Sequence, residues 1–371
     1  MKTLFIFGTR PEAIKLAPLI KEFEKNNLDF KVCITAQHRE MLDQVINFFD
    51  IKVDYDLDIM KQNQSLFELT ANLIKRLEEV LNDYNPTLTI VQGDTTTAFV
   101  GALSSFYKKI KIAHIEAGLR SFEKYSPFPE EINRSLIGKL ADFHFAPTSK
   151  TKENLLKEGI KNNVYVVGNT VIDALFLTLR LIKERGEDKY YEKYDFIDFS
   201  KKIILLTSHR RENWGKPLEN ICKAVLEIAN TFKDIEIVFP VHLNPNVRNI
   251  VFKYLNGKNN IHLIEPLKYP DLVWLMSKSY LILTDSGGIQ EEAPSLGKPV
   301  LVLRNVTERT EIIEAGCGKL VGTNKESIVK NVIKLLTDKN EYQKMSKAIN
   351  PYGDGTTSKK IVRILKDIFS S

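Results

Sequence analysis

The sequence contains little cysteine: Cys33, Cys222 and Cys317 are the only three among 371 residues, and they lie far apart. No Cys-x-x-Cys pair occurs, so the pattern indicates neither a disulfide framework nor a zinc site. Free thiols buried in a reducing compartment explain these residues better. We therefore expect a cytoplasmic protein without a metal site.

Long apolar runs are absent as well. No stretch reaches the roughly 18 apolar residues that a membrane-spanning helix needs. The apolar run near the N-terminus is short, and charge returns at Arg10, Glu12 and Lys15. A secretory signal has a longer apolar segment followed by a small-residue cleavage site. We expect neither a signal peptide nor a membrane partner.

The chain also lacks a concentrated block of basic residues. Its 53 Lys and Arg residues face 47 Asp and Glu residues, which gives a net charge of +6 that is scattered along the chain. This mild surplus suits an anionic small molecule and does not indicate a nucleic-acid partner. A length of 371 residues, 43% of them hydrophobic, is typical of a globular protein with two domains.

What the sequence does contain is a repeated alternation of a short apolar strand, a polar turn and an amphipathic helix. Strands are predicted at residues 3–7, 31–35, 87–91, 111–115, 203–207, 235–240, 261–264, 281–284 and 300–303. The charged stretch 184–200 interrupts the pattern and places a domain junction near or just before it. Two such halves predict an α/β protein with two Rossmann-like, doubly wound parallel sheets and a ligand cleft between them.

The loop after the first strand, residues 8–15, is a candidate anion site. A helix begins there, so its unpaired N–H groups and dipole favour phosphate, and Arg10 adds a guanidinium fork. The loop has neither the glycines of a dinucleotide fingerprint nor a P-loop motif. A plain turn carrying two solvated cations, Arg10 and Lys15, stays open as the alternative.

Acidic residues follow later strands of the first half. Asp94 comes soon after one strand, and Glu116 comes directly after the next. A carboxylate in this place is costly unless it is paired or functional. Capping of the next helix by Asp94 or a neighbouring threonine is one alternative. A surface salt bridge is the plainer interpretation of Glu130 and Arg134, which are four residues apart.

In the second half, His209 follows a strand and precedes two arginines, a combination suited to a diphosphate. His242 follows a later strand and is a weaker example of the same pattern. The most specific stretch is 284–293, where Gly287 and Gly288 allow close backbone approach at the start of a helix. Glu292 is placed to accept from ribose hydroxyls. A capped helix after a tight turn is the alternative.

These motifs resemble those of the non-hydrolysing UDP-N-acetylglucosamine 2-epimerases, and the resemblance runs nearly end to end. It rests on seven segments in this order: Gly8-Thr9-Arg10-Pro11-Glu12, Thr35-Ala36-Gln37-His38-Arg39, Gln92-Gly93-Asp94-Thr95, His114-Ile115-Glu116-Ala117-Gly118-Leu119-Arg120, Pro129-Glu130-Glu131, His209-Arg210-Arg211-Glu212 and Asp285-Ser286-Gly287-Gly288-Ile289-Gln290-Glu291-Glu292. The resemblance implies two Rossmann-like domains of the GT-B type, a homodimer, a UDP-sugar substrate, and no cofactor or metal. It also implies a C-terminal helix that crosses back, giving residues 1–170 plus 353–371 as one domain and 171–352 as the UDP-binding domain.

The reaction that the resemblance implies is reversible epimerisation of UDP-N-acetylglucosamine to UDP-N-acetylmannosamine. The C2 proton is not acidic, so the family eliminates UDP to a 2-acetamidoglucal and adds it back with the proton on the other face. Asp94 and Glu130 stand at the motif positions that hold the acid/base pair in the family, so the resemblance implies this role for them. For Glu116 the resemblance implies either stabilisation of the cationic centre or a part in the acid/base chemistry. For His209 it implies contact with the leaving diphosphate. The implied substrate-binding residues are Arg10, Lys15, Arg134, Leu267, Leu272, Ser286, Gly287, Gly288, Glu292 and Arg309.

Two departures from the family pattern carry predictions. Leu272 stands where some relatives stack an aromatic ring on uracil, so uracil would be held mainly by backbone near Leu267. Some bacterial relatives bind a second UDP-GlcNAc as an activator, and that possible allosteric site matches here at Gln37, Arg210 and His242. Glutamine and arginine are expected at two further positions, which are Glu40 and Asn63 here. The lost cation and added anion predict weak or altered activation.

Three other functions stay open at this stage. A GT-B glycosyltransferase shares the fold and the donor, a hydrolysing epimerase would release free N-acetylmannosamine and UDP, and a UDP-sugar sensor would need no catalytic acid. The three acids Asp94, Glu116 and Glu130 argue against the transferase, because inverting transferases usually need one base. The exact sugar is not fixed by the sequence.

Overall fold

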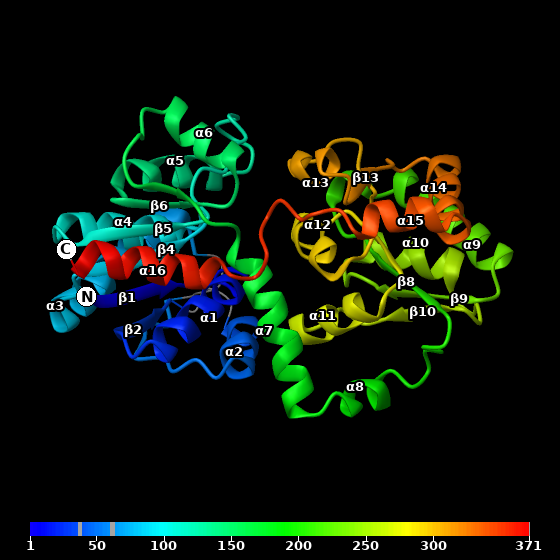
Figure 1. Cartoon of the computed structure of the whole chain (residues 1–371), viewed down its shortest axis with the longest axis horizontal. Coiled ribbons are helices and arrows are strands. Elements are labelled where there is room, and N and C mark those ends of the chain that lie inside the picture. Colours follow the sequence, from blue (N-terminus) through cyan, green and yellow to red (C-terminus); the bar gives the residue numbers. More distant parts are fainter. Residues whose placement is uncertain (36–38, 60–63, 371) are drawn as a thin grey trace. The chain divides into compact units, whose positions relative to one another are not determined.

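The computed structural model describes residues 1–35, 39–59 and 64–370. The chain divides into two compact units (Figure 1). Unit 1 consists of Met1–Leu177 and Tyr352–Ser371, and unit 2 of Thr178–Pro351. Unit 1 is therefore built from both ends of the chain, whereas unit 2 is continuous.

Unit 1 contains a sheet of seven parallel strands in the order β3-β2-β1-β4-β5-β6-β7. The strands are β1 (Lys2–Phe7), β2 (Asp29–Ile34), β3 (Tyr55–Asp56), β4 (Leu88–Gln92), β5 (Lys111–Ile115), β6 (Phe143–Ala146) and β7 (Val164–Val166). The order reverses between β1 and β4, which gives the sheet one topological switch point.

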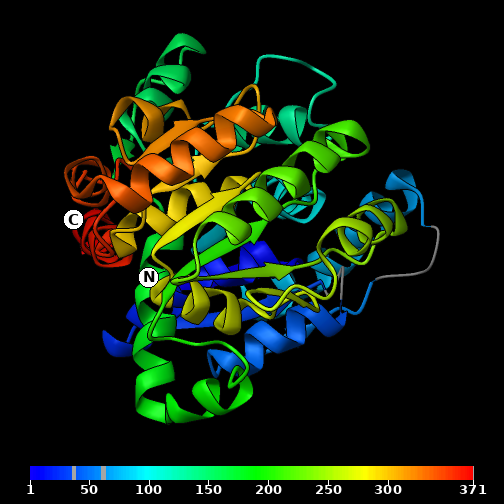
Figure 2. The ribbon, with the colours of Figure 1, turned by 90° about the vertical axis from the view of Figure 1, so that its right-hand side faces the viewer.

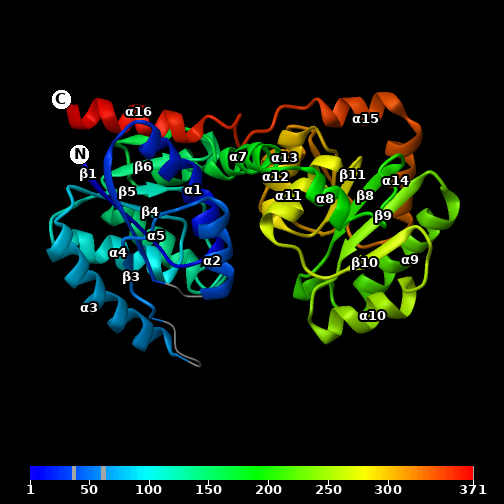
Figure 3. The ribbon, with the colours of Figure 1, turned by 90° about the horizontal axis from the view of Figure 1, so that it is seen from below.

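Helices lie on both faces of this sheet (Figure 3). They are α1 (Arg10–Lys25), α2 (Arg39–Phe48), α3 (Leu66–Tyr84), α4 (Thr96–Tyr107), α5 (Glu130–Leu140), α6 (Ser149–Lys157), α7 (Thr170–Arg185) and α16 (Thr357–Ser370). Helix α4 packs against α3 and α5, and α16 packs against α1. The division between the two units falls within α7.

Unit 2 contains a sheet of six parallel strands in the order β10-β9-β8-β11-β12-β13. The strands are β8 (Lys202–Thr207), β9 (Ile235–Pro240), β10 (Ile261–Ile264), β11 (Leu281–Thr284), β12 (Val300–Val302) and β13 (Gly318–Leu320). Here the order reverses between β8 and β11. Both sheets therefore have the doubly wound topology that the sequence predicts.

The helices of unit 2 include two short 3-10 segments. In chain order the helices of unit 2, with the 3-10 segments marked η, are α8 (Asp188–Lys193), η1 (Arg211–Asn213), α9 (Lys216–Thr231), α10 (Pro245–Leu255), α11 (Tyr269–Lys278), α12 (Gly287–Glu292), η2 (Ala293–Leu296), α13 (Thr310–Glu314), α14 (Lys325–Thr337) and α15 (Lys339–Ser346). Figure 2 shows α14 (orange) beside α9 (light green), which it contacts. Among the described residues, no helix is both long enough and apolar enough to cross a bilayer.

Local sequence signals explain where the helices begin and which side they bury. In α3, the Glu68 amide donates to the Ser65 hydroxyl at 3.2 Å and the Ser65 amide donates to the Glu68 carboxylate at 3.0 Å, so the capping box is confirmed. The helix ends at Tyr84, because Asn85 adopts a left-handed conformation with φ 49° and Pro86 follows. The apolar positions that recur along α1 and α3 are buried, as their spacing predicts.

A buried carboxylate fixes the start of the C-terminal helix. The two Asp173 oxygens accept from the backbone amides of Ser358 at 2.7 Å and Thr357 at 3.2 Å, in the first turn of α16. Burial raises the pKa of Asp173, and these hydrogen bonds partly oppose the increase. Asp173 therefore serves as the N-terminal cap of a helix that is nearly 200 residues away in sequence.

We expect Asp173→Ala to lower the free energy of unfolding by about 1–2 kcal/mol, because the first-turn amides of α16 lose their acceptor. The measurement is urea denaturation followed by circular dichroism. Asp173→Asn keeps one acceptor oxygen, but its NH₂ group would face the second amide, so we expect it to be destabilised as well. Unchanged stability in Asp173→Ala would contradict the capping role.

Candidate active site

Four of the polar loops singled out in the sequence flank the switch points of the two sheets. In unit 1 these are the loops after β1 and β4, and in unit 2 the loops after β8 and β11. The helices that follow neighbouring strands go to opposite faces at such a point, so the loops separate and leave room for a ligand.

Glu116 is the centre of a buried polar cluster in unit 1. It directly follows β5, has a left-handed backbone with φ 66°, and is 7% exposed. The Lys15 ammonium lies 2.6 and 2.7 Å from its two carboxylate oxygens. The side-chain amide of Asn169 donates to Oε1 at 2.9 Å and that of Gln92 donates to Oε2 at 2.5 Å. Donors thus surround this carboxylate and stabilise its charged form.

Asp94 lies in the same cluster. A guanidinium nitrogen of Arg134 donates to its carboxylate, and the Asn133 side chain donates to its backbone carbonyl at 3.0 Å. Burial raises the pKa of Asp94, and the charge of Glu116 adds to this, while Arg134 and Lys15 act in the opposite direction. The net increase makes Asp94 a better proton acceptor than an ordinary aspartate.

The simple capping interpretation of Asp94 does not hold. Thr95 is the N-cap of α4, because its hydroxyl accepts from the Ala98 amide at 3.0 Å. Asp94 is left to pair with Arg134. Sequence reasoning left the choice between the two residues open, and the structure assigns the cap to the threonine.

Glu130 is less closely integrated than the other two predicted acids. It is the first residue of α5 and is partly buried, but it makes no hydrogen bond or ion pair with the residues that the structure describes. Arg134 pairs with Asp94 and also approaches Glu131 at 3.4 Å. The alternative of a Glu130–Arg134 surface pair is therefore not realised within the described part of the chain.

The start of α1 differs from the expectation of free N–H groups. The carboxylate of Glu12 accepts from the backbone amides of Gly8 at 3.1 Å and Thr9 at 2.8 Å. Its other oxygen accepts from the Thr95 hydroxyl at 2.7 Å, which joins the β1 and β4 loops. A phosphate at this point would have to compete with Glu12 for these donors.

Arg10 nevertheless keeps the character of an anion-binding residue. It is partly buried, and burial lowers its pKa. No carboxylate among residues 1–35, 39–59 and 64–370 forms an ion pair with it. A guanidinium that is partly desolvated and has no counter-ion is a natural partner for an anionic ligand.

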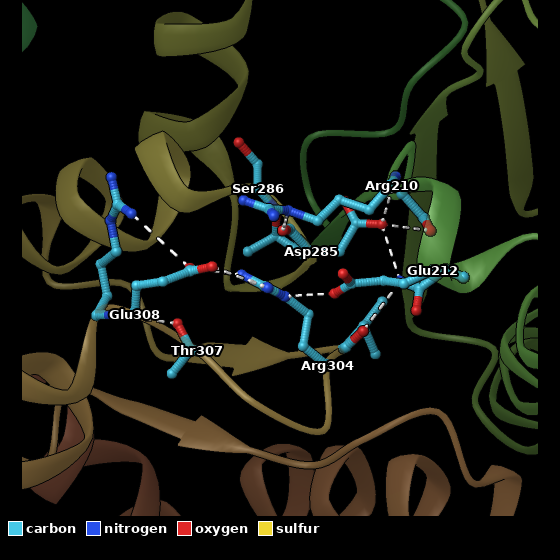
Figure 4. A network of polar contacts seen from close by, with 12 residues as sticks. Arg210, Glu212, Asp285, Ser286, Arg304, Thr307 and Glu308 are labelled. Carbon is cyan, nitrogen blue, oxygen red and sulfur yellow. Dashed lines mark hydrogen bonds and ion pairs between the residues drawn. The ribbon is translucent and has the colours of Figure 1, made fainter. Parts of the chain in front are cut away.

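In unit 2, the fully buried carboxylate of Asp285 organises the loop after β8 (Figure 4). It accepts from the Ser208 hydroxyl at 2.9 Å, from the amides of His209 at 3.0 Å and Arg210 at 3.1 Å, and from the Asn213 side chain at 2.9 Å. Burial alone would raise the pKa of Asp285, but hydrogen bonds and the charge of His209 hold it below its ordinary value.

Asp285 also orients the ring of His209. Nδ1 of His209 lies 3.2 Å from a carboxylate oxygen, and the ring is about half exposed. The His242 ring stacks beside it, with centroids 6.2 Å apart and planes inclined by 21°. Because Nδ1 faces the carboxylate, Nε2 is on the side of the ring that faces away from Asp285.

The loop after β11 brings a guanidinium onto a glycine backbone. A Cβ atom added at Gly287 would lie 3.2 Å from the guanidinium carbon of Arg309. Arg309 is held there by the buried Glu291 carboxylate, to which its Nε donates at 2.8 Å. Ser286 precedes the helix without capping it through its side chain. Gly287 therefore allows Arg309 to lie flat over the start of α12.

The other residues of unit 2 that were predicted to bind UDP lie on α11, on α12 and in the loop before α11. Glu292 is buried and accepts from the Tyr269 hydroxyl at 2.7 Å. Leu267 is partly buried in the β10–α11 loop, and Leu272 is partly buried in α11. Sequence reasoning did not identify Tyr269, because nothing local links it to a residue in another helix.

Arg304 connects the two loops that carry His209 and Arg309 (Figure 4). Its guanidinium donates to Glu212 at 2.7 Å and to Glu308 at 2.8 Å. Burial would raise the pKa of Glu308, but hydrogen bonding to Arg304 lowers it to about 2. The cationic loops of unit 2 are thus fixed by internal ion pairs.

The predicted allosteric residues are only partly described. Gln37 lies outside the described residues, as does Asn63. Arg210 is partly buried, with its guanidinium Nε donating to the Asp285 carbonyl at 2.9 Å, and His242 is exposed beside His209. The predicted weak activation therefore stays a prediction.

Comparison with known proteins places this geometry in a family context. The family model described as UDP-N-acetylglucosamine 2-epimerase matches residues 21–366. The chain is 55% identical to a UDP-N-acetylglucosamine 2-epimerase from Campylobacter jejuni, over 98% of this chain and 97% of that protein. A Neisseria meningitidis UDP-GlcNAc 2-epimerase crystallised with UDP-GlcNAc is 53% identical, with a TM-score of 0.89 over 99% of this chain and all of that one. A Listeria monocytogenes homologue has a TM-score of 0.91 at 48% identity, over 100% of this chain and 96% of that one.

We expect Asp285→Asn to lower the free energy of unfolding at pH 7 by about 2–4 kcal/mol, because amide hydrogens replace an acceptor that faces several buried donors. The control is Ser208→Ala, which removes one of these donors and should cost about 1 kcal/mol. Urea denaturation measures both. Equal losses would contradict the organising role of the carboxylate.

The pKa of Asp285 is lowered in the folded protein, so the sign of its pH dependence is fixed. Its stabilisation is complete above the ordinary aspartate pKa of about 4 and decreases as pH falls through the lower folded value. The difference between wild type and D285N should therefore not decrease between pH 8 and pH 5. A difference that shrinks within this range would show that another group is responsible.

Proposed function

Because this chain belongs to the UDP-N-acetylglucosamine 2-epimerase family, we propose that it interconverts UDP-N-acetylglucosamine and UDP-N-acetylmannosamine without hydrolysis. The observation that carries this proposal is that two acids with different environments lie in one polar cluster, after the carboxyl ends of β4 and β5 in unit 1. Asp94 is a carboxylate with a raised pKa, and Glu116 is a carboxylate surrounded by donors. Two acids in different electrostatic environments are suited to two roles in one reaction.

The proposed reaction has two halves. In the first, a base removes the proton from C2, the C1–O bond breaks, and UDP leaves with the electron pair to give a 2-acetamidoglucal. In the second, the UDP oxygen bonds to C1 again, while an acid returns a proton to the opposite face of C2. The two epimers therefore differ only in the face that receives the proton.

We assign the first-half base to Asp94, because burial raises its pKa toward the range in which a general base is effective. Glu116, held ionised by its donors, would stabilise positive charge at C1. Glu130 would serve the other face, since it is the remaining predicted acid and its carboxylate is not committed to an ion pair among the described residues. Arg134 would keep Asp94 in place.

The leaving group would be held by residues of unit 2. Arg309 lies over Gly287 at the start of α12, with its guanidinium held there by the Glu291 carboxylate, so it would place a positive charge beside the diphosphate. His209 presents the nitrogen that does not face Asp285. Glu292, positioned by Tyr269, would accept from the ribose hydroxyls. The roles proposed for Arg10, Ser286, Gly288, Leu267 and Leu272 as UDP contacts follow the family resemblance.

The same resemblance supports further proposals about the protein in the cell. We expect a homodimer in the cytoplasm, whose product is used in the synthesis of envelope or capsule polysaccharide. The domain boundaries 170/171 and 352/353 are also proposals.

Incubation of the enzyme with UDP-N-acetylglucosamine in D₂O tests the reaction. We expect deuterium at C2 of both epimers, formation of UDP-N-acetylmannosamine, and little free sugar, detected by NMR and mass spectrometry. Free N-acetylmannosamine with UDP would instead identify a hydrolysing enzyme. Absence of deuterium from C2 would exclude both mechanisms.

Variants in the two units should show different kinetic defects. Asp94→Asn removes the proposed base, so kcat should fall by about 10²–10⁴-fold while UDP affinity changes little. Arg309→Met removes a charge-assisted contact of the diphosphate, so KM should rise roughly 10- to 100-fold. Steady-state kinetics and UDP titration calorimetry measure both effects, with thermal unfolding as the check on folding. An active D94N would point to another base or to a non-catalytic sensor.

A further inference from the structure

We propose that Asn169 and Gln92 are positioning residues whose side-chain amides hold the Glu116 carboxylate in a single orientation beside Asp94. The inference rests on the proposed function, because it takes Glu116 as part of the sugar site. It adds what fixes the orientation of the Glu116 carboxylate. Neither amide belongs to the residues for which the family resemblance implies a role.

The orientation of the Asn169 amide is fixed by its other contacts. Asn169 is 2% exposed, and its Oδ1 accepts from the Val171 amide at 3.1 Å. Its Nδ2 must therefore be the atom that faces Glu116, at 2.9 Å from Oε1. Its own backbone amide donates to the Tyr352 carbonyl at 2.7 Å, which ties it to the returning C-terminal segment of unit 1. Both ends of this asparagine are thus anchored.

Gln92 holds the other carboxylate oxygen. It is the last residue of β4 and is 2% exposed. Its Nε2 donates to Glu116 Oε2 at 2.5 Å, and an amide oxygen in that place would face another acceptor. Adjacent strand ends are held in register, because the Gly93 amide donates to the Ile115 carbonyl at 3.0 Å. Each oxygen of Glu116 thus has its own amide donor.

Lys15 supplies charge but not orientation. Its ammonium lies almost equally close to both oxygens, at 2.6 and 2.7 Å, and an ammonium on a flexible stem has no preferred plane. The amides act from two different directions, one on each oxygen, so together they fix the rotation of the carboxylate. We infer that Lys15 balances the negative charge of Glu116, while the two amides fix the orientation of its carboxylate.

Within the described part of unit 1, the ionisable groups that interact with Glu116 include Lys15 from α1, Asp94 from the β4–α4 loop and His114 from β5. Arg134 from α5 lies next to Asp94, with which it is paired. Burial lowers the pKa of His114 to about 3, so it stays neutral at the pH of an assay. A new negative charge next to Glu116 would therefore act electrostatically mainly on Glu116, Asp94, Lys15 and Arg134.

The plainer alternative is that the amides only satisfy a buried carboxylate and stabilise the fold. Asn169→Asp and Gln92→Glu distinguish the two, because each keeps the side-chain shape but replaces the donor with an acceptor. Two facing carboxylates share one proton, and only the protonated pair can restore the lost hydrogen bond. An unprotonated pair leaves Glu116 pushed out of position.

For N169D we expect kcat at pH 8 to fall at least tenfold with KM within threefold of wild type. We also expect kcat to recover as pH is lowered to about 6, so that the basic side of the rate profile moves to lower pH. Q92E should behave in the same way. A defect that only weakened the fold would reduce thermal stability without moving the profile.

Asn154→Asp is the matched control. Asn154 is also a buried asparagine of unit 1, and its Nδ2 donates to the Gly118 carbonyl at 3.0 Å rather than to a carboxylate. Its replacement creates the same kind of lesion at a backbone carbonyl instead of at the Glu116 carboxylate. We expect N154D to lose stability but to keep the wild-type pH profile.

The possible outcomes separate cleanly. A wild-type enzyme without C2 deuterium exchange would overturn the proposed function itself. An active wild type whose N169D and Q92E variants keep the wild-type kcat and pH profile would overturn the positioning role alone, as would an identical pH shift in N154D. If neither charged variant folds, Asn169→Ala decides: a tenfold loss of kcat at unchanged KM supports the role, and a wild-type kcat overturns it.

Discussion

The structure depends on the rule that a carboxylate taken out of water must be surrounded by donors. Three buried acids that follow the carboxyl ends of strands meet this rule. Glu12 is capped by backbone amides and a threonine, Glu116 by an ammonium and two amides, and Asp285 by hydroxyl, backbone and amide donors. Each acid draws together loops that are distant in sequence. The loops that would hold the ligand are therefore shaped by internal ion and hydrogen-bond networks.

These three acids serve the site in different ways. Asp285 is enclosed by its own loop and its neighbours, so it acts on His209 and Arg210 and has little capacity left for a ligand. Glu12 similarly uses its oxygens on Gly8, Thr9 and Thr95. Glu116 differs, because the donors around it come from three separate segments of unit 1. Such an anion can stabilise positive charge in a bound sugar while its own position is maintained.

The sequence allowed much of the fold to be predicted. Strands such as Ile235–Pro240 and Leu281–Thr284 are continuous apolar runs, so their pattern identifies them directly. The strands β3, β6, β7 and β13 were not predicted. They are two to four residues long and depend on pairing with a neighbouring strand rather than on a local pattern. The charged segment 184–200 predicts a domain junction near or just before it, and the two compact units divide between Leu177 and Thr178, within α7.

The candidate site was predictable only where a residue directly follows a strand. Asp94, Glu116 and His209 were found in this way, and the structure places Asp94 and Glu116 in one cluster. Their partners were not predictable. Asn169 is 53 residues from Glu116 in sequence, and Tyr269 is 23 residues from Glu292. An amide or a phenol in such a position has no local signature, because its role arises only when the chain is folded.

The discontinuous make-up of unit 1 has a consequence for synthesis on the ribosome. Unit 2 is one uninterrupted segment, so all of it has been translated once Pro351 is added. Unit 1 lacks α16, and with it a packing partner of α1 and the amides that Asp173 caps, until residues 357–370 have been added. The domain whose translation begins first is therefore completed after unit 2, and the nascent chain carries an unfinished N-terminal core while unit 2 is synthesised.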